Sequence, residues 1–181
     1  IIGGDLEQRI PVQSRDEIGI LADAFNQMAG RLKDTISGLR ESEAKYRSIY
    51  ENSAEGIFKT SIDGRFLNVN PALASMLGYD SPTDLINSVK DLKKDFYVNP
   101  DDRDRFLSIL MRHGTVNAFE AQCYCRDRQV IWLSYSARLQ RTSDGAPLLI
   151  EGFGVNIDQR KKLEQALNHS RNYLEKIINT I

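Results

Sequence analysis

Two histidines and two cysteines are the side chains best suited to metal binding or nucleophilic chemistry. His113 lies at the end of a predicted helix, where a cation also suits the helix dipole, and His169 lies in a later helix. Cys123 and Cys125 lie two residues apart on a predicted strand, so they share a face in poor geometry for a mutual disulfide. We interpret both as reduced thiols of the core, because no Cys–His spacing of a metal site accompanies them.

Motifs and charge exclude further classes of function. The sequence has no Walker loop and no dinucleotide-binding fingerprint, so it gives no reason to expect a nucleotide-dependent enzyme. It carries 24 basic and 25 acidic residues, and this near balance gives no electrostatic reason to expect a nucleic-acid partner. No apolar run approaches the ~18 residues of a transmembrane helix, and no signal peptide is visible.

Residues 53–158 have the pattern of one small α+β domain. Two short strands are predicted over 53–60 and 66–69, and a helix starts directly after them at Asn70-Pro71. Asparagine is a preferred N-cap, and proline fits the first helical position because its missing N–H would have no helical partner there. A second helix is predicted at Asn99-Pro100 by the same rule.

Three longer strands are predicted to follow, over 116–125, 130–140 and 148–157. Apolar side chains alternate with polar ones along the first two, which gives each strand one buried face. Five strands with helices inserted after the second predict an α+β sheet rather than repeated βαβ units.

A heptad pattern runs through the segments on both sides of this domain. In front of it, a capping box at Ser14–Glu17 opens a helix whose apolar positions step by three and four, which is a period of 3.5. That period favours pairing with a partner helix over packing on the helix's own domain, whose stripe would drift at 3.6. The predicted dimer seam consists of Ile18, Leu21, Phe25, Met28, Leu32, Leu39, Tyr46, Ile49, Leu163, Leu167, Leu174 and Ile177. Its polar positions, Thr35, Ser42 and Ser170, are expected to weaken the pairing locally.

Several short segments, ordered along the chain, resemble those of a PAS domain. They are Glu55-Gly56-Ile57, Asp63-Gly64, Asn68–Ala72, Met76–Tyr79, Trp132-Leu133-Ser134 and Gly152–Asp158. The resemblance implies the PAS fold, a five-stranded antiparallel sheet with helices on one face, flanked here by coiled-coil helices. The sequence departs from the family pattern at Asn156-Ile157-Asp158, where the family often reads Asp-Ile-Thr. The asparagine at position 156 removes the charge of the family's aspartate at the junction of sheet and helix.

The family also includes cofactor binders, whose ligands do not match this sequence. Haem-binding members carry their ligand on the helix where this chain has Arg103–Arg105, and flavin photosensors carry a reactive cysteine in a helix. We therefore expect no cofactor, with an unknown small molecule left open as a ligand. Its predicted pocket, between sheet and helices, is lined by Ile57, Val69, Leu73, Met76, Leu77, Phe106, Leu110, Cys123, Leu133 and Tyr135. The alternative is a core filled by these same side chains.

Residues 1 to about 40 resemble the connector and second helix of a HAMP domain. The similar segments are Gly4-Asp5-Leu6, Arg9–Val12, Asp16–Gly19 and Phe25–Met28. This resemblance implies a parent receptor with a transmembrane segment upstream, and the absence of an initial methionine leads us to expect a fragment.

The predicted organisation is a partial HAMP domain at 1–40, a linking helix at 41–52, a PAS domain at 53–158 and an output helix at 159–181. The expected function is signal sensing and relay through a homodimer, in the cytoplasmic portion of a bacterial inner-membrane receptor. The expected effector, in the same chain, is a histidine kinase, although no catalysis is expected within these residues. A diguanylate cyclase or chemotaxis-type output, and a ligand-free dimerisation spacer, remain alternatives.

Overall fold

One long helix, α1 (Glu17–Asn52), opens the part of the chain that the computed structural model describes, residues 17–178. The chain divides into two units, residues 1–49 and 50–181, so the last turn of α1 belongs to the second unit. Large apolar side chains stand exposed along α1, including Leu21, Leu39 and Ile49. The predicted capping box, at the start of this helix, lies outside the described residues.

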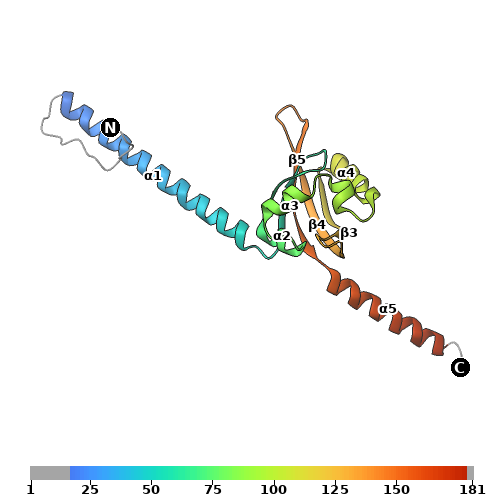
Figure 1. Ribbon diagram of the computed structural model, residues 1–181. Helices are drawn as coiled ribbons and strands as arrows, with labels where there is room; N and C mark the ends of the chain where they lie inside the picture. The colour runs from blue at the N-terminus through green and yellow to red at the C-terminus, as the bar shows by residue number, and fades with distance from the viewer. Residues whose placement is uncertain (1–16, 179–181) are drawn as a thin grey trace. The chain divides into compact units, whose positions relative to one another are not determined.

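The second unit contains a sheet, helical segments inserted between its second and third strands, and a final helix (Figure 1). In chain order these elements are β1 (Gly56–Thr60), β2 (Phe66–Val69), α2 (Pro71–Met76), α3 (Pro82–Ser88), the π-helical turn η1 (Leu92–Phe96), α4 (Pro100–His113), β3 (Thr115–Tyr124), β4 (Val130–Arg141), β5 (Pro147–Asn156) and α5 (Asp158–Ile178). No helix among these described residues has both the length and the apolar character needed to cross a bilayer.

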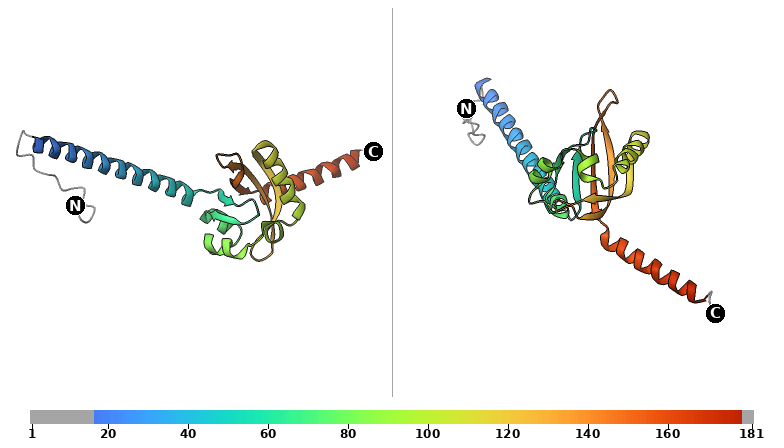
Figure 2. Two further views of the ribbon diagram at one scale, coloured as in Figure 1. Left: turned by 90° about the horizontal axis from the view of Figure 1, so that it is seen from above. Right: turned by 45° about the vertical axis from the view of Figure 1, so that its right-hand side comes forward.

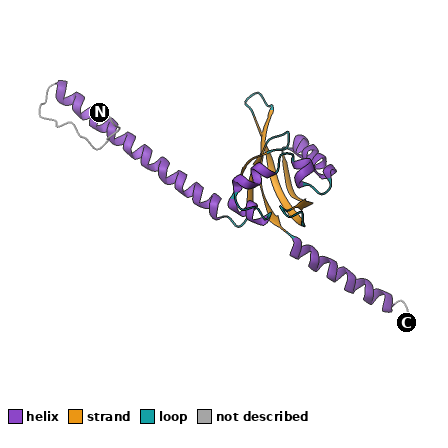
Figure 3. Cartoon of the chain, viewed as in Figure 1, coloured by secondary structure: helices purple, strands orange, loops and turns teal. Residues whose placement is uncertain are grey.

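The five strands form one antiparallel sheet in the order β2-β1-β5-β4-β3, as the fold class predicted. The central strand β5 is therefore the last of the domain, and α5 follows it directly (Figure 3). Gly152 on β5 pairs with Phe58 and Ala137 on its two neighbours. A Cβ atom there would lie 2.3 Å from the Ser136 carbonyl oxygen, so only glycine allows this close strand packing.

The core lies between the inserted helices and one face of the sheet (Figure 2). The helices contribute Leu73, Leu85, Phe106 and Leu110, and the sheet contributes Ala121, Cys123, Leu133, Tyr135 and Ile150. Aromatic rings meet edge to face at its centre, where Phe106 lies 5.2 Å from Tyr135 between ring centroids.

The helix starts follow the predicted capping rules. Asn70 and Asn99 cap α2 and α4 with a proline at the first turn, and Gly114 ends α4 in the left-handed conformation, with φ of 76°. Ser81 caps α3, also with a proline at the first turn. The turn η1 is not predicted from the sequence, since five residues show no helical periodicity.

The alternation predicted for 116–125 holds from Phe119 onward but not before it. Val116 and Phe119 are both buried although they are three residues apart. A bulge lies between them, and Ala118 within it has a positive φ of 48°. The extra residue of the bulge shifts by one position which side chains face the core. A strict alternation of two residues does not predict this shift.

Candidate ligand pocket and helix junctions

A cavity of about 30 Å³ lies inside the PAS-like unit, between the sheet and the helices. Its walls come from every layer of the domain: Phe58, Thr60, Phe66, Leu73, Leu92, Phe96, Tyr97, Arg103, Phe106, Leu133, Tyr135 and Gly154. A buried water occupies ~10–15 Å³ by this measure, so the space holds about two water-sized groups. Any ligand that fits without repacking the core is therefore very small.

Four of the ten residues predicted to line a pocket do so: Leu73, Phe106, Leu133 and Tyr135. Five others do not line it but pack in or against the surrounding core: Val69, Leu77, Leu110, Cys123 and Met76.

The structure corrects the predicted placement of Ile57. Along β1 it is Phe58 and Thr60 that line the cavity, whereas Ile57 does not. The face of β1 that meets the cavity is therefore that of Phe58 and Thr60, and not that of Ile57 as predicted. Gly56 explains the ambiguity, because it faces Leu73 so closely that a Cβ would lie 2.8 Å from Leu73 Cδ1. A glycine leaves no side chain by which the sequence could reveal its face.

The buried hydroxyl of Tyr135 donates a hydrogen bond to the hydroxyl of Tyr97 at 2.6 Å. Burial raises the pKa of both phenols well above the ordinary value, so both stay protonated. Tyr97 directly follows η1, which the sequence did not reveal, and so it was missed. Thr60 and Arg103, the other polar groups of the wall, were missed as well.

Asn70 connects the end of α1 to the domain. Its side chain is fully buried, and Oδ1 accepts hydrogen bonds from the N–H groups of Ile57 at 2.9 Å and Leu73 at 3.0 Å. Nδ2 donates to the carbonyls of Tyr50 at 3.1 Å and Glu55 at 2.9 Å. One amide therefore ties the last turn of α1 to β1 and α2 with all four of its hydrogen-bonding positions occupied.

Asp158 makes the corresponding connection at the start of α5. Its Oδ1 accepts a hydrogen bond at 2.7 Å from the backbone N–H of Trp132 on β4, the residue before the cavity-lining Leu133. Asn156, whose amide replaces the carboxylate common in the family, accepts at 2.8 Å from the backbone N–H of Asp158. Position 156 thus keeps a side-chain acceptor without a charge, and the carboxylate at the junction is that of Asp158.

Glu120 on β3 holds the first turn of α5 by two ion pairs. Lys161 Nζ and Arg160 Nη2 each lie 2.5 Å from one of its carboxylate oxygens. These hydrogen bonds, from Lys161 first and Arg160 second, lower the pKa of Glu120 below its ordinary 4.5. The stabilisation is therefore complete above pH 4.5 and is lost as the pH falls through the lower pKa of the folded state.

We expect Glu120→Gln to flatten the dependence of the free energy of unfolding on pH below 4.5, because the substituted residue no longer binds a proton there. Urea unfolding of both proteins at a series of acid pH values measures this slope. The slope of Glu51→Gln, at an exposed glutamate of α1, is the reference with which the slope of Glu120→Gln is compared. An unaltered slope in Glu120→Gln would contradict the assigned ion pairs.

The residues first considered for chemistry lie apart. His113 is exposed at the end of α4, and His169 is exposed on α5. Cys123 is buried, Cys125 is half-buried, and burial raises the pKa of both thiols, which makes them poor nucleophiles. No cluster of three metal-binding side chains occurs within the described part of the chain.

Comparison with known proteins assigns both segments. The PAS domain family matches residues 54–159, and the HAMP domain family matches residues 3–34. The PAS match covers more than half of the chain, which therefore belongs to the PAS domain family. With a HAMP domain before the PAS domain, it is a signal-sensing and signal-relay module.

Curated relatives of this chain include sensor kinases and a diguanylate cyclase. The chain is 27% identical over 181 residues to the sensor histidine kinase TmoS of Ectopseudomonas mendocina, covering 98% of the chain and 18% of that protein. It is 28% identical over 131 residues to the probable diguanylate cyclase DgcE of Escherichia coli strain K12, covering 70% of the chain and 11% of that protein. It is 32% identical over 110 residues to the sensor protein kinase WalK of Staphylococcus haemolyticus, covering 58% and 18%. The chain thus spans less than a fifth of each relative.

Solved structures support the fold. A PAS domain from Colwellia psychrerythraea matches with a TM-score of 0.55 at 16% identity, over 67% of this chain and 98% of that one. A sensory box histidine kinase/response regulator from Burkholderia thailandensis matches with a TM-score of 0.55 at 22% identity, over 73% and 98%.

Proposed function

We propose that the chain is the sensing and relay segment of a membrane-anchored receptor, and that two copies pair in parallel along their heptad seams. The state of the PAS domain is passed through these seams to an effector, a histidine kinase, in the same protein. The observation that carries the proposal is the row of exposed apolar residues on α1, which a partner helix would bury. The match to TmoS over 98% of the chain supports the kinase as effector.

Most of the large exposed apolar residues of α1 lie on the seam, and Ile20 lies outside it. Leu32 and Leu39 are 49% and 69% exposed, although leucine side chains gain most from burial. Charged neighbours off the seam pair within the helix, Glu41 with Lys45 and Glu43 with Arg47, each at 2.8 Å. At 36 residues the helix is about 54 Å long, enough for some five heptads of coiled coil.

The seam of α5 is consistent with the same pairing. Leu163 and Leu167 are exposed on one side of this helix. The side chains of Leu174 and Ile177, which continue the predicted seam, lie outside the described residues. The domain limits 1–40, 41–52, 53–158 and 159–181 remain part of the proposal, with α1 ending at Asn52 and α5 beginning at Asp158.

Both helices are bonded to elements that wall the cavity, which gives the relay a physical path. The Trp132–Asp158 bond places the start of α5 one residue from Leu133, and β5 contributes Gly154 to the wall before it leads into α5. A change in cavity packing alters these contacts, and a coiled coil with discrete arrangements converts that change into a shifted equilibrium.

The polar seam positions are the place to test the relay. The hydroxyl of Thr35 donates a hydrogen bond to the Arg31 carbonyl of the same helix at 2.8 Å. It therefore contributes nothing to pairing with a second helix. We expect leucine at Thr35 and Ser42 to raise dimer affinity and fix one packing arrangement. In a fusion of this chain to a histidine kinase catalytic part, basal autophosphorylation should then change about tenfold.

The matched control places leucine at Gln27 and Ser37, which lie outside the seam. Unchanged kinase output together with unchanged dimer affinity in the Thr35 and Ser42 variant would contradict the relay.

A diguanylate cyclase is the second candidate effector, favoured by the match to DgcE over 70% of the chain. The same substitutions in a fusion to a diguanylate cyclase domain discriminate between the two. The effector that the native segment regulates is the one whose output changes when Thr35 and Ser42 are replaced.

A further inference from the structure

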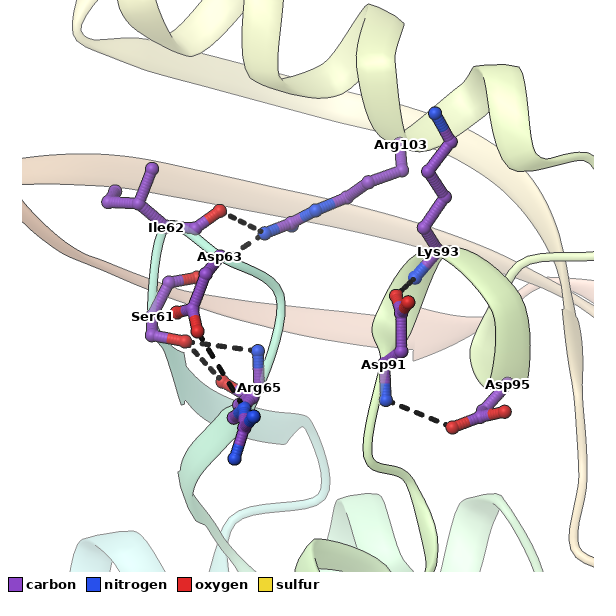
Figure 4. A network of polar contacts seen from close by, with 8 residues as sticks. All are labelled: Ser61, Ile62, Asp63, Arg65, Asp91, Lys93, Asp95 and Arg103. Carbon is purple, nitrogen blue, oxygen red and sulfur yellow. Dashed lines mark hydrogen bonds and ion pairs between the residues drawn. The ribbon is translucent and has the colours of Figure 1, made fainter.

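Arg103 is a buried cation that no carboxylate neutralises. It is only 3% exposed, and Nη2 donates to the carbonyls of Ser61 at 3.4 Å and Ile62 at 3.5 Å (Figure 4). Both hydrogen bonds are long compared with the usual ~2.9 Å. The guanidinium also lies 5.7 Å from the ring centroid of Phe106, a weak substitute for a counter-charge. Buried charges in proteins are normally paired.

Nearby acids are engaged elsewhere. Asp63 is exposed, pairs with Arg65 at 3.7 Å and is turned away from Arg103 in Figure 4. Its pKa is lowered first by its hydrogen bond with Ser61 and last by the charge of Arg103, with which it forms no ion pair. On α4, Asp104 pairs with Lys93 at 2.7 Å. The part of the chain that the structure describes shows no ion pair to Arg103, so its charge is available to a ligand.

Thr60 adds a second unsatisfied group to the same cavity wall. Its side chain is 2% exposed, and Oγ1 has no hydrogen-bond partner among the described residues. The carbonyl that Arg103 contacts belongs to Ser61, the next residue, so the hydroxyl and the guanidinium approach the cavity from the same end of β1. The bond between Tyr97 and Tyr135 uses one of their two hydroxyl hydrogens and leaves the other as a donor.

The remaining wall is apolar, formed by phenyl rings and leucines such as Phe66, Phe96 and Leu133. A guanidinium matches the planar, two-oxygen end of a carboxylate, and the apolar wall suits a short hydrocarbon end. A tetrahedral dianion would leave oxygens against phenyl rings, and the volume of about 30 Å³ excludes larger acids.

We propose that this cavity binds a monocarboxylate of one or two carbons, with its oxygens held by Arg103, Thr60 and the tyrosine pair. The inference rests on the proposed function, in which the PAS cavity is the sensing site, and it names the class of signal. The ligand neutralises the buried cation, and its contact with the Leu133 side of the wall lies next to the bond that holds α5.

Isothermal titration calorimetry of the whole chain with sodium acetate and sodium formate tests the proposal. Saturable binding of one ion per chain is expected, with no binding of acetamide, the neutral analogue, or of sodium chloride at the same ionic strength. Arg103→Met should weaken acetate binding about 100-fold, because it removes the charge at similar side-chain volume. Thr60→Val, of the same shape, should weaken it about tenfold without lowering the thermal unfolding temperature, because the lost hydroxyl had no partner in the protein.

Thermal unfolding of both variants verifies that they fold. Acetate binding that is absent in the folded unmodified chain, equal to that of acetamide, or unchanged in Thr60→Val would overturn the assignment. The oligomeric state is independent of these results. A dimer that does not bind acetate refutes only the ligand, whereas a monomer that binds acetate refutes only the relay.

Discussion

Replacing Asn70 by alanine is expected to lower the free energy of unfolding of the PAS domain by about 4 kcal/mol. The substitution leaves two N–H groups, of Ile57 and Leu73, and two carbonyls, of Tyr50 and Glu55, without the bonds that the amide provides. It also leaves a hole at a fully buried position. Urea unfolding followed by circular dichroism measures the loss.

Asn99→Ala is the matched control for this prediction. Asn99 is also an N-cap before a proline, but it is exposed and its side chain accepts only from the N–H of Asp101. Its loss should cost about 1 kcal/mol. Asn70→Asp keeps the oxygen that accepts from the two N–H groups but replaces the donating NH2 by an oxygen that faces two carbonyls. This variant therefore tests the donor half of the amide alone. Equal costs for Asn70→Ala and Asn99→Ala would show that the connection to α1 contributes nothing.

Glutamate at both Leu32 and Leu39 is expected to convert the proposed dimer to a monomer, with a dissociation constant raised at least ~100-fold. In a parallel pair each new carboxylate would be buried in the seam opposite its own copy, so desolvation and like-charge repulsion act together. Size-exclusion chromatography with light scattering measures the mass, 20.5 kDa for one chain.

The control for this second prediction is glutamate at Gln27 and Ser37, on the outer face of the same helix, which adds the same charge. A seam variant that remains as dimeric as this control would mean that the exposed leucines have another role.

The sequence predicts the local features of this fold because their causes are local. Asn70-Pro71 and Asn99-Pro100 predict helix starts, because each asparagine accepts from an N–H group two or three residues further on. The heptad steps are likewise visible within α1 itself. The second role of Asn70 is different, since its partner Tyr50 lies 20 residues away on another element. No local rule connects the two.

The pocket residues also divide into those that a local pattern predicts and those that depend on contacts between distant elements. Leu133 and Tyr135 follow from the alternation of β4, whereas the phase of β1 at Ile57 was assumed wrongly because Gly56 carries no side chain. Arg103 was missed for an electrostatic reason, since an arginine three residues into a helix is ordinarily solvated. Only the packing of α4 on the loop after β1 shows that it is buried.

Disulfide cross-linking at a single seam position tests the central claim most directly. With Leu39→Cys, two chains paired in parallel and in register bring the two new thiols together, and oxidation should give a linked dimer rapidly. Ser37→Cys, on the outer face, and the unmodified chain, whose Cys123 is buried and whose Cys125 is half-buried, serve as controls. Linkage at residue 39 alone is the predicted result. No linkage there, or equal linkage at residues 37 and 39, would contradict the paired-helix relay.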